Sequence, residues 1–384
     1  MTVYFALSKN GKLCVSMGGR MISSSIYFIG LCSMRIREFI YLMMSAVVTG
    51  AVLSGCGDAN GWKKIEVSQE KVSLTVQHFD RDLFALDTAN AAAGDAAMQA
   101  KYGSFYQDYL VQMMGFSRAD NPMDTHQLDP HAKLYAFIGN HDIRELYDTV
   151  QQAFPNTSAL ESELTDMLKH FQHYFPRKPH FKRVYTFITA FNYNVATYTD
   201  SIYCIGLDMY LGSHCHFYQS TEIPQFVISK MKPAYIVPNA TEALYNLYFD
   251  YSAASAESPL IEALINEGRK YYFMECMLPE TPDSMIIGYT SRQEEWCRNS
   301  EKSIWGYFNE HDLLYKVNAM EQKRYTADGP TTNGMPSDAP PKVGSWIGWQ
   351  IVRRFMKNSK VSVEDLMTKY TAKQIFNMSN YKPK

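Results

Sequence analysis

The sequence predicts a mixed α+β fold that is mainly helical and contains a small β-sheet. The chain has 384 residues, of which 46% are hydrophobic and 20% charged, which is typical of a globular protein with one large or two smaller domains. Residues 183–191 and 201–210 are rich in β-branched and aromatic side chains, so we expect a pair of strands. Residues 259–277 show helical periodicity, and further helices are expected on both sides of them.

The segment that ends at Cys56 has the features of a lipoprotein signal peptide in the right order. A basic Met34-Arg-Ile-Arg37 precedes an uncharged run, 39–54, which ends in Leu53-Ser-Gly-Cys56. This ending is the lipobox pattern of bacterial lipoproteins, which predicts cleavage before Cys56 and acylation of its thiol. The alternative is an uncleaved membrane anchor, for which the apolar run is short.

The predicted signal peptide divides the chain into segments. Residues 1–33 precede its basic region, and Met34 would be a natural start of translation. We therefore expect that residues 1–33 are an over-extension of the N-terminus and carry no fold. Residues 34–55 are the predicted signal peptide and residues 56–70 a tether. Residues 71–384 are expected to form the folded domain, with a candidate sub-boundary near 252–258.

The charge of the chain argues against nucleic acid as a partner. The formal net charge is −2, and residues 1–55 hold five basic residues against one acidic residue, so the mature chain is more acidic. Without a polybasic segment, attachment would depend on acyl chains at Cys56, with the domain lipid-anchored in the cell envelope and facing the periplasm. We expect envelope proteins as partners and predict no cofactor.

Before residue 211 the sequence alternates between extended and helical segments. Val72, Leu74 and Val76 alternate as in a first strand, and Phe79-Asp-Arg-Asp-Leu-Phe84 has apolar ends that can pack inward. Residues 118–130 are predicted to be a loop, and helices are predicted near 143–154 and 158–175. An aromatic stripe at helical spacing is expected to belong to the core: Tyr102, Phe105, Tyr106, Tyr109, Leu110 and Met113.

One histidine and cysteine motif suggests a metal site, His214-Cys215-His216 with Asp208 nearby. Imidazole, thiolate and carboxylate groups all bind metals. The chain lacks a second group of metal-ligand residues at suitable spacing. We therefore favour the interpretation that residues 214–216 lie in an exposed loop. Four cysteines follow Cys56: Cys204, Cys215, Cys276 and Cys297. They could form disulfides after export or stay buried as free thiols, and the sequence leaves both alternatives open.

The most informative helix is predicted at residues 259–277. Ser258 suits the N-cap, Pro259 suits the first helical position, and Leu278-Pro279 ends the helix. At its centre, Asn266-Glu267-Gly268-Arg269-Lys270 matches the glutamate of the zinc-peptidase motif H-E-x-x-H, but both histidines are absent. Asn266 and Lys270 stand at the two ligand positions. Because neither an amide nor an ammonium suits zinc, we predict that this helix binds no catalytic zinc. A core helix unrelated to peptidases is the alternative.

After the central helix the chain is expected to be helical to its end. The apolar residues 344–356 contain Gly344 and Gly348, four positions apart, which would let another helix or a ligand approach closely. Asp328-Gly-Pro and Asp338-Ala-Pro-Pro341 bracket a loop. The other helices predicted after residue 211 are 224–230, 239–251, 291–299, 303–315, 363–370 and 372–378.

Six motifs follow one another over nearly the whole mature chain. They are the lipobox at Cys56, Phe79–Phe84, Ile205–Gly212, Ile265–Phe273, Ile304–Phe308 and Gly344–Val352. In this combination the chain resembles the gliding motility-associated lipoprotein GldB family of the Bacteroidota. That family is similar in pattern to the gluzincin (zincin) metallopeptidases, which implies a sheet of residues 183–191 and 202–209 beside the 259–277 helix. The resemblance favours a degenerate metallopeptidase over a chance match.

The resemblance implies a membrane-anchored envelope lipoprotein linked to gliding motility or secretion. The missing histidines imply a pseudo-metallopeptidase that binds protein or peptide, with residues 201–210 as the edge strand that pairs with an extended peptide. An active envelope hydrolase that uses Glu267 with His214, His216 or His311 is the alternative. No catalytic residue and no metal ligand is assigned, and the candidate groove consists of Glu267, Lys270, Asn266, Asp208, Trp346 and Trp349.

Overall fold

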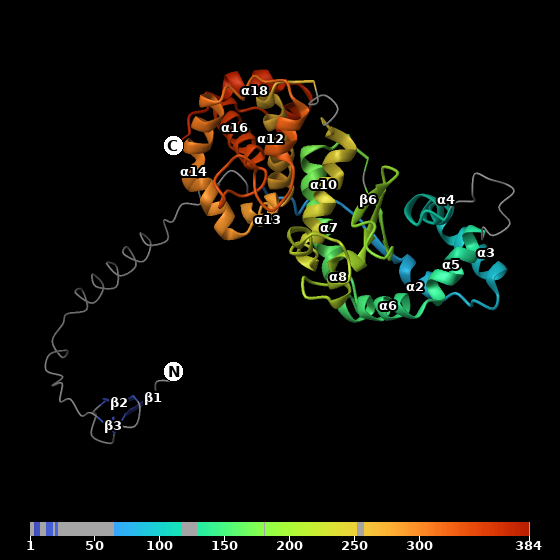
Figure 1. Ribbon diagram of the computed structural model, residues 1–384. Helices are drawn as coiled ribbons and strands as arrows, with labels where there is room; N and C mark the ends of the chain where they lie inside the picture. The colour runs from blue at the N-terminus through green and yellow to red at the C-terminus, as the bar shows by residue number, and fades with distance from the viewer. Residues whose placement is uncertain are drawn as a thin grey trace. The chain divides into compact units, whose positions relative to one another are not determined.

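The computed structural model describes residues 65–116, 129–179, 181–251 and 257–383, together with three short strands near the N-terminus (Figure 1). These are β1 (Tyr4–Leu7), β2 (Leu13–Met17) and β3 (Arg20–Met21), which pair as an antiparallel sheet. They belong to a compact unit, Met1–Trp62, that is distinct from the unit Lys63–Lys384, and they lie in the segment predicted to carry no fold. Cys56, the predicted signal peptide and most of the predicted loop 118–130 lie outside the described residues.

The domain contains a four-stranded sheet with the order β4-β5-β7-β6. β4 (Thr75–His78), β5 (Arg183–Phe187) and β7 (Ile202–Gly206) run parallel, and β6 (Val195–Tyr198) pairs antiparallel with β7 at the edge. Both β-branched runs of the sequence therefore form strands. All five residues of β7 are buried, as expected for a strand with neighbours on both sides.

The prediction that residues 201–210 form the edge strand is wrong. β7 is an inner strand because residues 195–198 fold back onto it as a hairpin. At the end of this hairpin away from its turn, Gly206 permits the close approach of the chain before β6, since a Cβ atom there would lie 2.0 Å from the carbonyl oxygen of Tyr193. The extended run also ends at Gly206, and Leu207–Tyr210 form the 3₁₀-helix η2.

The helices before β5 pack an aromatic core against the sheet. The ring of Phe79 contacts the rings of Tyr102, Phe105 and Tyr109 at centroid distances of 4.8, 5.1 and 4.8 Å. The aromatic stripe predicted for the core is therefore confirmed, whereas α3 and α5 were not expected from the sequence. The elements are α2 (Phe79–Phe84), α3 (Ala91–Tyr102), α4 (Ser104–Asp108), the π-helix η1 (Tyr109–Met113), α5 (Pro130–Gly139), α6 (His141–Ala153) and α7 (Ser158–Tyr174).

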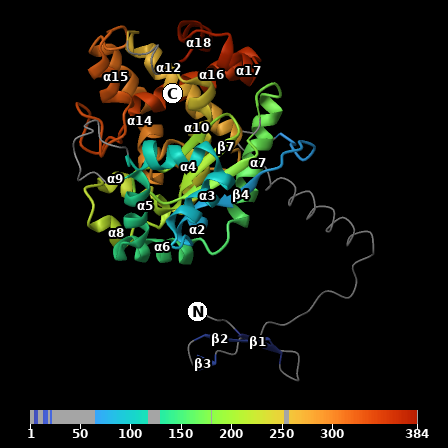
Figure 2. The same ribbon diagram turned by 90° about the vertical axis from the view of Figure 1, so that its right-hand side faces the viewer.

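Helices fill the chain after β7. Figure 2 shows α15 to α18 gathered at one end of the domain, away from α2 and α6. α10 packs against both β6 and α12, so it lies between the sheet and the central helix (Figure 1). The elements are α8 (His216–Gln219), α9 (Gln225–Ile228), η3 (Pro233–Tyr235), α10 (Ile236–Phe249), α12 (Leu260–Met277), α13 (Asp283–Ile287), α14 (Ser291–Glu310), α15 (Ala319–Thr326), α16 (Val343–Ser359), α17 (Val363–Thr368) and α18 (Ala372–Ser379).

One continuous helix, α14, replaces the two helices predicted at 291–299 and 303–315. A capping box starts it, because the Thr290 side chain accepts from the Gln293 amide and the Gln293 side chain accepts from the Thr290 amide. The turn at residues 299–303 contains no proline or glycine to break the helix.

Glycines bring α12 and α16 into close contact. A Cβ atom on Gly344 would lie 2.6 Å from Leu264 Cδ2, and one on Gly268 would lie 2.3 Å from the carbonyl carbon of Gly348. The close approach predicted for Gly344 and Gly348 is confirmed, and the partner is the central helix.

The described cysteines carry thiols. Cys204, Cys276 and Cys297 are buried and Cys215 is half-buried. Burial raises the pKa of the Cys297 thiol to about 12, so this thiol stays protonated and unreactive at neutral pH.

Candidate functional site

The central helix α12 is buried almost all round, with one polar strip. Its N-terminus is anchored by the loop after α14, because the amides of Leu260 and Ile261 donate to the carbonyls of Lys316 and Leu314 at 3.0 and 2.9 Å. Pro259, rather than the predicted Ser258, occupies the N-cap position.

The polar strip lies in the middle of α12. Asn266, Glu267 and Lys270 are only half-buried, whereas the neighbouring Gly268 and Arg269 are buried. Positions i, i+1 and i+4 share one side of a helix, so these three side chains lie together. In this strip Asn266 and Lys270 stand at the two positions that histidines occupy in the H-E-x-x-H pattern.

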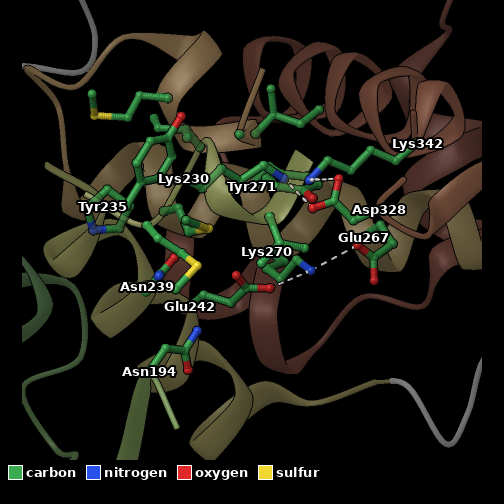
Figure 3. A pocket seen from close by; sticks show the side chains of 18 of the residues that line it. Asn194, Lys230, Tyr235, Asn239, Glu242, Glu267, Lys270, Tyr271, Asp328 and Lys342 are labelled. Atoms are coloured by element: carbon green, nitrogen blue, oxygen red, sulfur yellow. Dashed lines mark hydrogen bonds and ion pairs between the residues drawn. The ribbon is translucent and has the colours of Figure 1, made fainter. Parts of the chain in front are cut away.

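The Lys270 ammonium sits between two carboxylates. Its Nζ lies 2.9 Å from Glu242 Oε1 on α10 and 3.0 Å from Glu267 Oε2 on α12 (Figure 3). Burial opposes the ammonium, but the two carboxylates raise the pKa of Lys270 well above its usual value. The same ion pair lowers the pKa of Glu242. The cluster therefore carries two anions and one cation at neutral pH.

A second cluster has the opposite balance of charge. Asp328, which follows α15, pairs with Lys230 after α9, and its Oδ1 lies 3.8 Å from the Nζ of Lys342 (Figure 3). Burial favours the neutral acid, but Lys342 and Lys230 together hold the pKa of Asp328 below its usual value. Burial, together with the nearby Lys230 ammonium, lowers the pKa of Lys342 to about 8.

Both clusters line one cavity of about 490 Å³ (Figure 3). Tyr271, Tyr235, Met274 and Ile286 add aromatic and apolar wall, and Asn194, directly before β6, also lines the cavity. A neighbouring hollow of about 600 Å³ shares the lining residues Glu242, Glu267 and Lys270 and adds Asn266. A cavity of this size with a few polar groups is typical of a small-molecule or peptide site.

The other predicted groove residues lie in the core. Asp208 is fully buried, and its Oδ2 accepts hydrogen bonds from the amides of Thr189 and Phe191 at 3.1 and 2.8 Å. Trp346 and Trp349 are buried on α16, and the Trp349 indole donates to Glu275 Oε2 at 2.7 Å. Asp208, Trp346 and Trp349 are not among the residues that line either hollow.

The histidines of the hydrolase alternative do not line the cavity with Glu267. His214 and His216 are exposed in the turn before α8 and at its start, and His216 Nε2 lies 3.5 Å from Glu145 Oε1. His311 stacks edge-on against the Tyr307 ring at 4.4 Å. Within the described residues, no three His, Cys, Asp or Glu side chains are grouped as metal ligands.

Four of the six charged residues that line the cavity were not predicted from the sequence. Lys230, Glu242, Asp328 and Lys342 come from four separate segments, and no local pattern marks them. The only signal was indirect, since Asp328 begins a loop motif and Glu242 lies in a predicted helix.

Comparison with known proteins adds a family assignment. A family model described as "Gliding motility protein GldB" matches residues 60–383. The chain belongs to the GldB family. Membership assigns it to the gliding-motility-associated lipoproteins and indicates a cell-envelope location. No match to this GldB-family chain was found among curated proteins or solved structures, so the likeness to gluzincins stays a prediction. Among the described helices, none has both the length and the apolar character needed to cross a bilayer.

Proposed function

We propose that this GldB-family protein is a lipid-anchored envelope protein that binds peptide segments without cleaving them. The observation that carries the proposal is the position of Lys270. It stands where a zinc peptidase has its second histidine, and its ammonium is held 2.9 and 3.0 Å from two carboxylates. On this proposal the Lys270 ammonium supplies the positive charge that a metal ion supplies in a zinc peptidase, and Glu267 forms an ion pair with it.

The edge of the sheet supplies a mode of binding. β6 has a strand neighbour on one side, β7, and no second strand partner within the part of the chain that the structure describes. Asn194, which leads into β6, lines the same cavity as Glu267. An extended peptide added along β6 would run toward this cavity, with main-chain hydrogen bonds for affinity and the cavity for side-chain selection.

The test is metal analysis and a broad peptidase screen on the full-length protein and Glu267→Gln, together with binding of ten-residue peptides capped at both ends. Glu262→Gln is the matched control, because Glu262 lies on the same helix and does not line the cavity. We expect no stoichiometric zinc, no cleavage, and peptide binding that changes in Glu267→Gln but not in Glu262→Gln. Zinc near one equivalent, or cleavage that Glu267→Gln abolishes, would refute the proposal.

A further inference from the structure

The cavity has two ends of opposite charge. At the acidic end, Glu242 and Glu267 share one lysine, Lys270. At the basic end, Lys230 and Lys342 share one aspartate, Asp328. Each end therefore has one charge more than its own partners neutralise, negative at one end and positive at the other.

The unsatisfied group at the basic end is the Lys342 ammonium. Lys342 is 8% exposed, and its Nζ is 3.8 Å from the nearest Asp328 oxygen, which is beyond hydrogen-bond distance. Lys230 donates a hydrogen bond to the other Asp328 oxygen. Among the described residues the Lys342 ammonium makes no hydrogen bond, so an incoming anion at this end of the cavity would supply a charged hydrogen-bond partner.

The backbone conformation at Lys342 is unusual, and its side chain lies against the cavity wall. Lys342 is the N-cap of α16 and adopts a left-handed conformation, φ 48° and ψ 37°, which is uncommon for a residue other than glycine. Its ammonium also lies 5.9 Å from the centre of the Tyr271 ring, a wall of the cavity. The side chain is thus directed along the cavity wall rather than toward bulk solvent.

The acidic end has spare acceptors. Lys270 contacts one oxygen of Glu242 and one of Glu267, and within the described residues the second oxygen of each makes no hydrogen bond. The side chains of Glu242 and Glu267 are 41% and 32% exposed, and both line the cavity. They are suited to accept hydrogen bonds from a ligand ammonium.

We propose that the cavity binds a short peptide of two or three residues through both of its free termini. Its ammonium would lie at Glu242 and Glu267, its carboxylate at Lys230 and Lys342, and an apolar side chain against Tyr271 and Met274. The inference rests on the proposed function, because it specifies which peptides the site selects. Complementary charge at both ends would disfavour a peptide capped at either end, since capping removes the charge that pairs with that end of the cavity.

The test is calorimetric titration of the full-length protein with the tripeptide Ala-Leu-Ala and with its N-acetylated, C-amidated and doubly capped forms. We expect the free peptide to bind and each single cap to weaken binding by about tenfold or more. Because this series uses the unmodified protein, it is decisive even if a variant fails to fold.

Variants then assign each terminus to its end of the cavity. In Lys342→Gln the preference for the free over the amidated peptide should shrink, because only Lys230 remains at that end, whereas Lys342→Arg should keep the preference. In Glu242→Gln the preference for the free over the acetylated peptide should shrink in the same way. Lys302→Gln, an exposed change on α14 outside the cavity, is the control and should leave all affinities unchanged.

Two results overturn the inference and differ in what they say of the proposed function. If capped and free tripeptides bind equally, or only the capped ten-residue peptides bind, the selection of termini is wrong but peptide binding stands. If no peptide binds in any form, both proposals fail.

Discussion

The backbones of Gly348 and Leu264 are in direct contact. A Cβ atom on Gly348 would lie 1.6 Å from the carbonyl oxygen of Leu264, just before the polar strip of α12. Main chain cannot move aside as a flexible side chain can, so this contact sets the distance between α12 and α16.

Gly348→Ala should destabilise the domain. Forcing the two helices apart is expected to lower the free energy of unfolding by about 1–3 kcal/mol or more, measured by urea denaturation. Gly306→Ala is the control, because Gly306 lies within α14 and a Cβ there has nothing within 4 Å. Removing a helical glycine at this position should raise stability by about 0.5–1 kcal/mol. Equal stability of Gly348→Ala and the wild type would disprove the packing described for α16.

Lys342 should make stability depend on pH in the alkaline range. Burial lowers its pKa to about 8, so between pH 8 and about 10.5 the folded protein holds fewer protons than the unfolded chain. The cost of burying the ammonium is therefore full below pH 8 and disappears as the pH rises through that window. Lys230, Asp328, Lys270 and Glu242 contribute to the charge around it.

Lys342→Met is accordingly expected to be more stable than the wild type at pH 7, by an amount of the order of 3 kcal/mol or less. The advantage should shrink as denaturation is measured at rising pH toward 10. Since a neutral side chain removes the cost at every pH, a constant difference would show that Lys342 is not the titrating group.

Asp208 should make stability depend on pH in the acidic range, and here the free energy of unfolding should fall as the pH rises. Burial raises its pKa to about 7, although the amides of Phe191 and Thr189 favour the anion, and its Oδ1 has no hydrogen-bond partner among the described residues. Between pH 4 and 7 the folded protein therefore holds more protons than the unfolded chain, so the free energy of unfolding falls as the pH rises.

Asp208→Asn keeps an acceptor for the two amides and removes the charge. We expect similar stability to the wild type at pH 4 and a gain of the order of 4 kcal/mol or less at pH 8, measured by urea denaturation at both values. A variant that is less stable than the wild type at pH 8 would show that the carboxylate is needed in its charged form.

Cys56→Ala tests the lipid anchor of the proposed function. Each acyl CH₂ buried in a bilayer contributes about 0.8 kcal/mol, so two or three chains anchor firmly and their loss should release the protein. The readouts are lipid labelling and the amount of protein in the washed membrane pellet. Cys215→Ala, which removes a half-buried thiol elsewhere, should stay in the pellet. Unacylated protein that remains attached would rule out the anchor.

Local sequence patterns were sufficient to predict most individual strands and helices. The β-branched runs predicted β5 and β7, and the spacing of Gly344 and Gly348 predicted a close helix contact. β6 was missed because Asn192-Tyr-Asn194 is typical of a turn, and four residues are too few to show alternation. Because β6 was missed, residues 201–210 were wrongly predicted to be the edge strand.

The candidate site could be predicted only in part. Glu267 and Lys270 were found because they share one helix turn, a spacing that sequence alone defines. Lys230 and Asp328, 98 residues apart, meet only through the packing of separate loops. Trp346 and Trp349 were expected in the groove, but a large aromatic side chain on an apolar helix is as suited to the core, where the structure places them.

The residues that line the cavity run from Asn194 to Lys342, and this spread links occupancy to the folding of the domain. No fragment that lacks Lys230, α12 or the segment before α16 contains both complete charged ends, so a ligand that needs both binds the native state alone. Such a ligand raises the melting temperature with its concentration, and at one hundred times its dissociation constant it adds about 2.7 kcal/mol to the free energy of unfolding. Thermal denaturation can therefore reveal natural ligands before any activity is known.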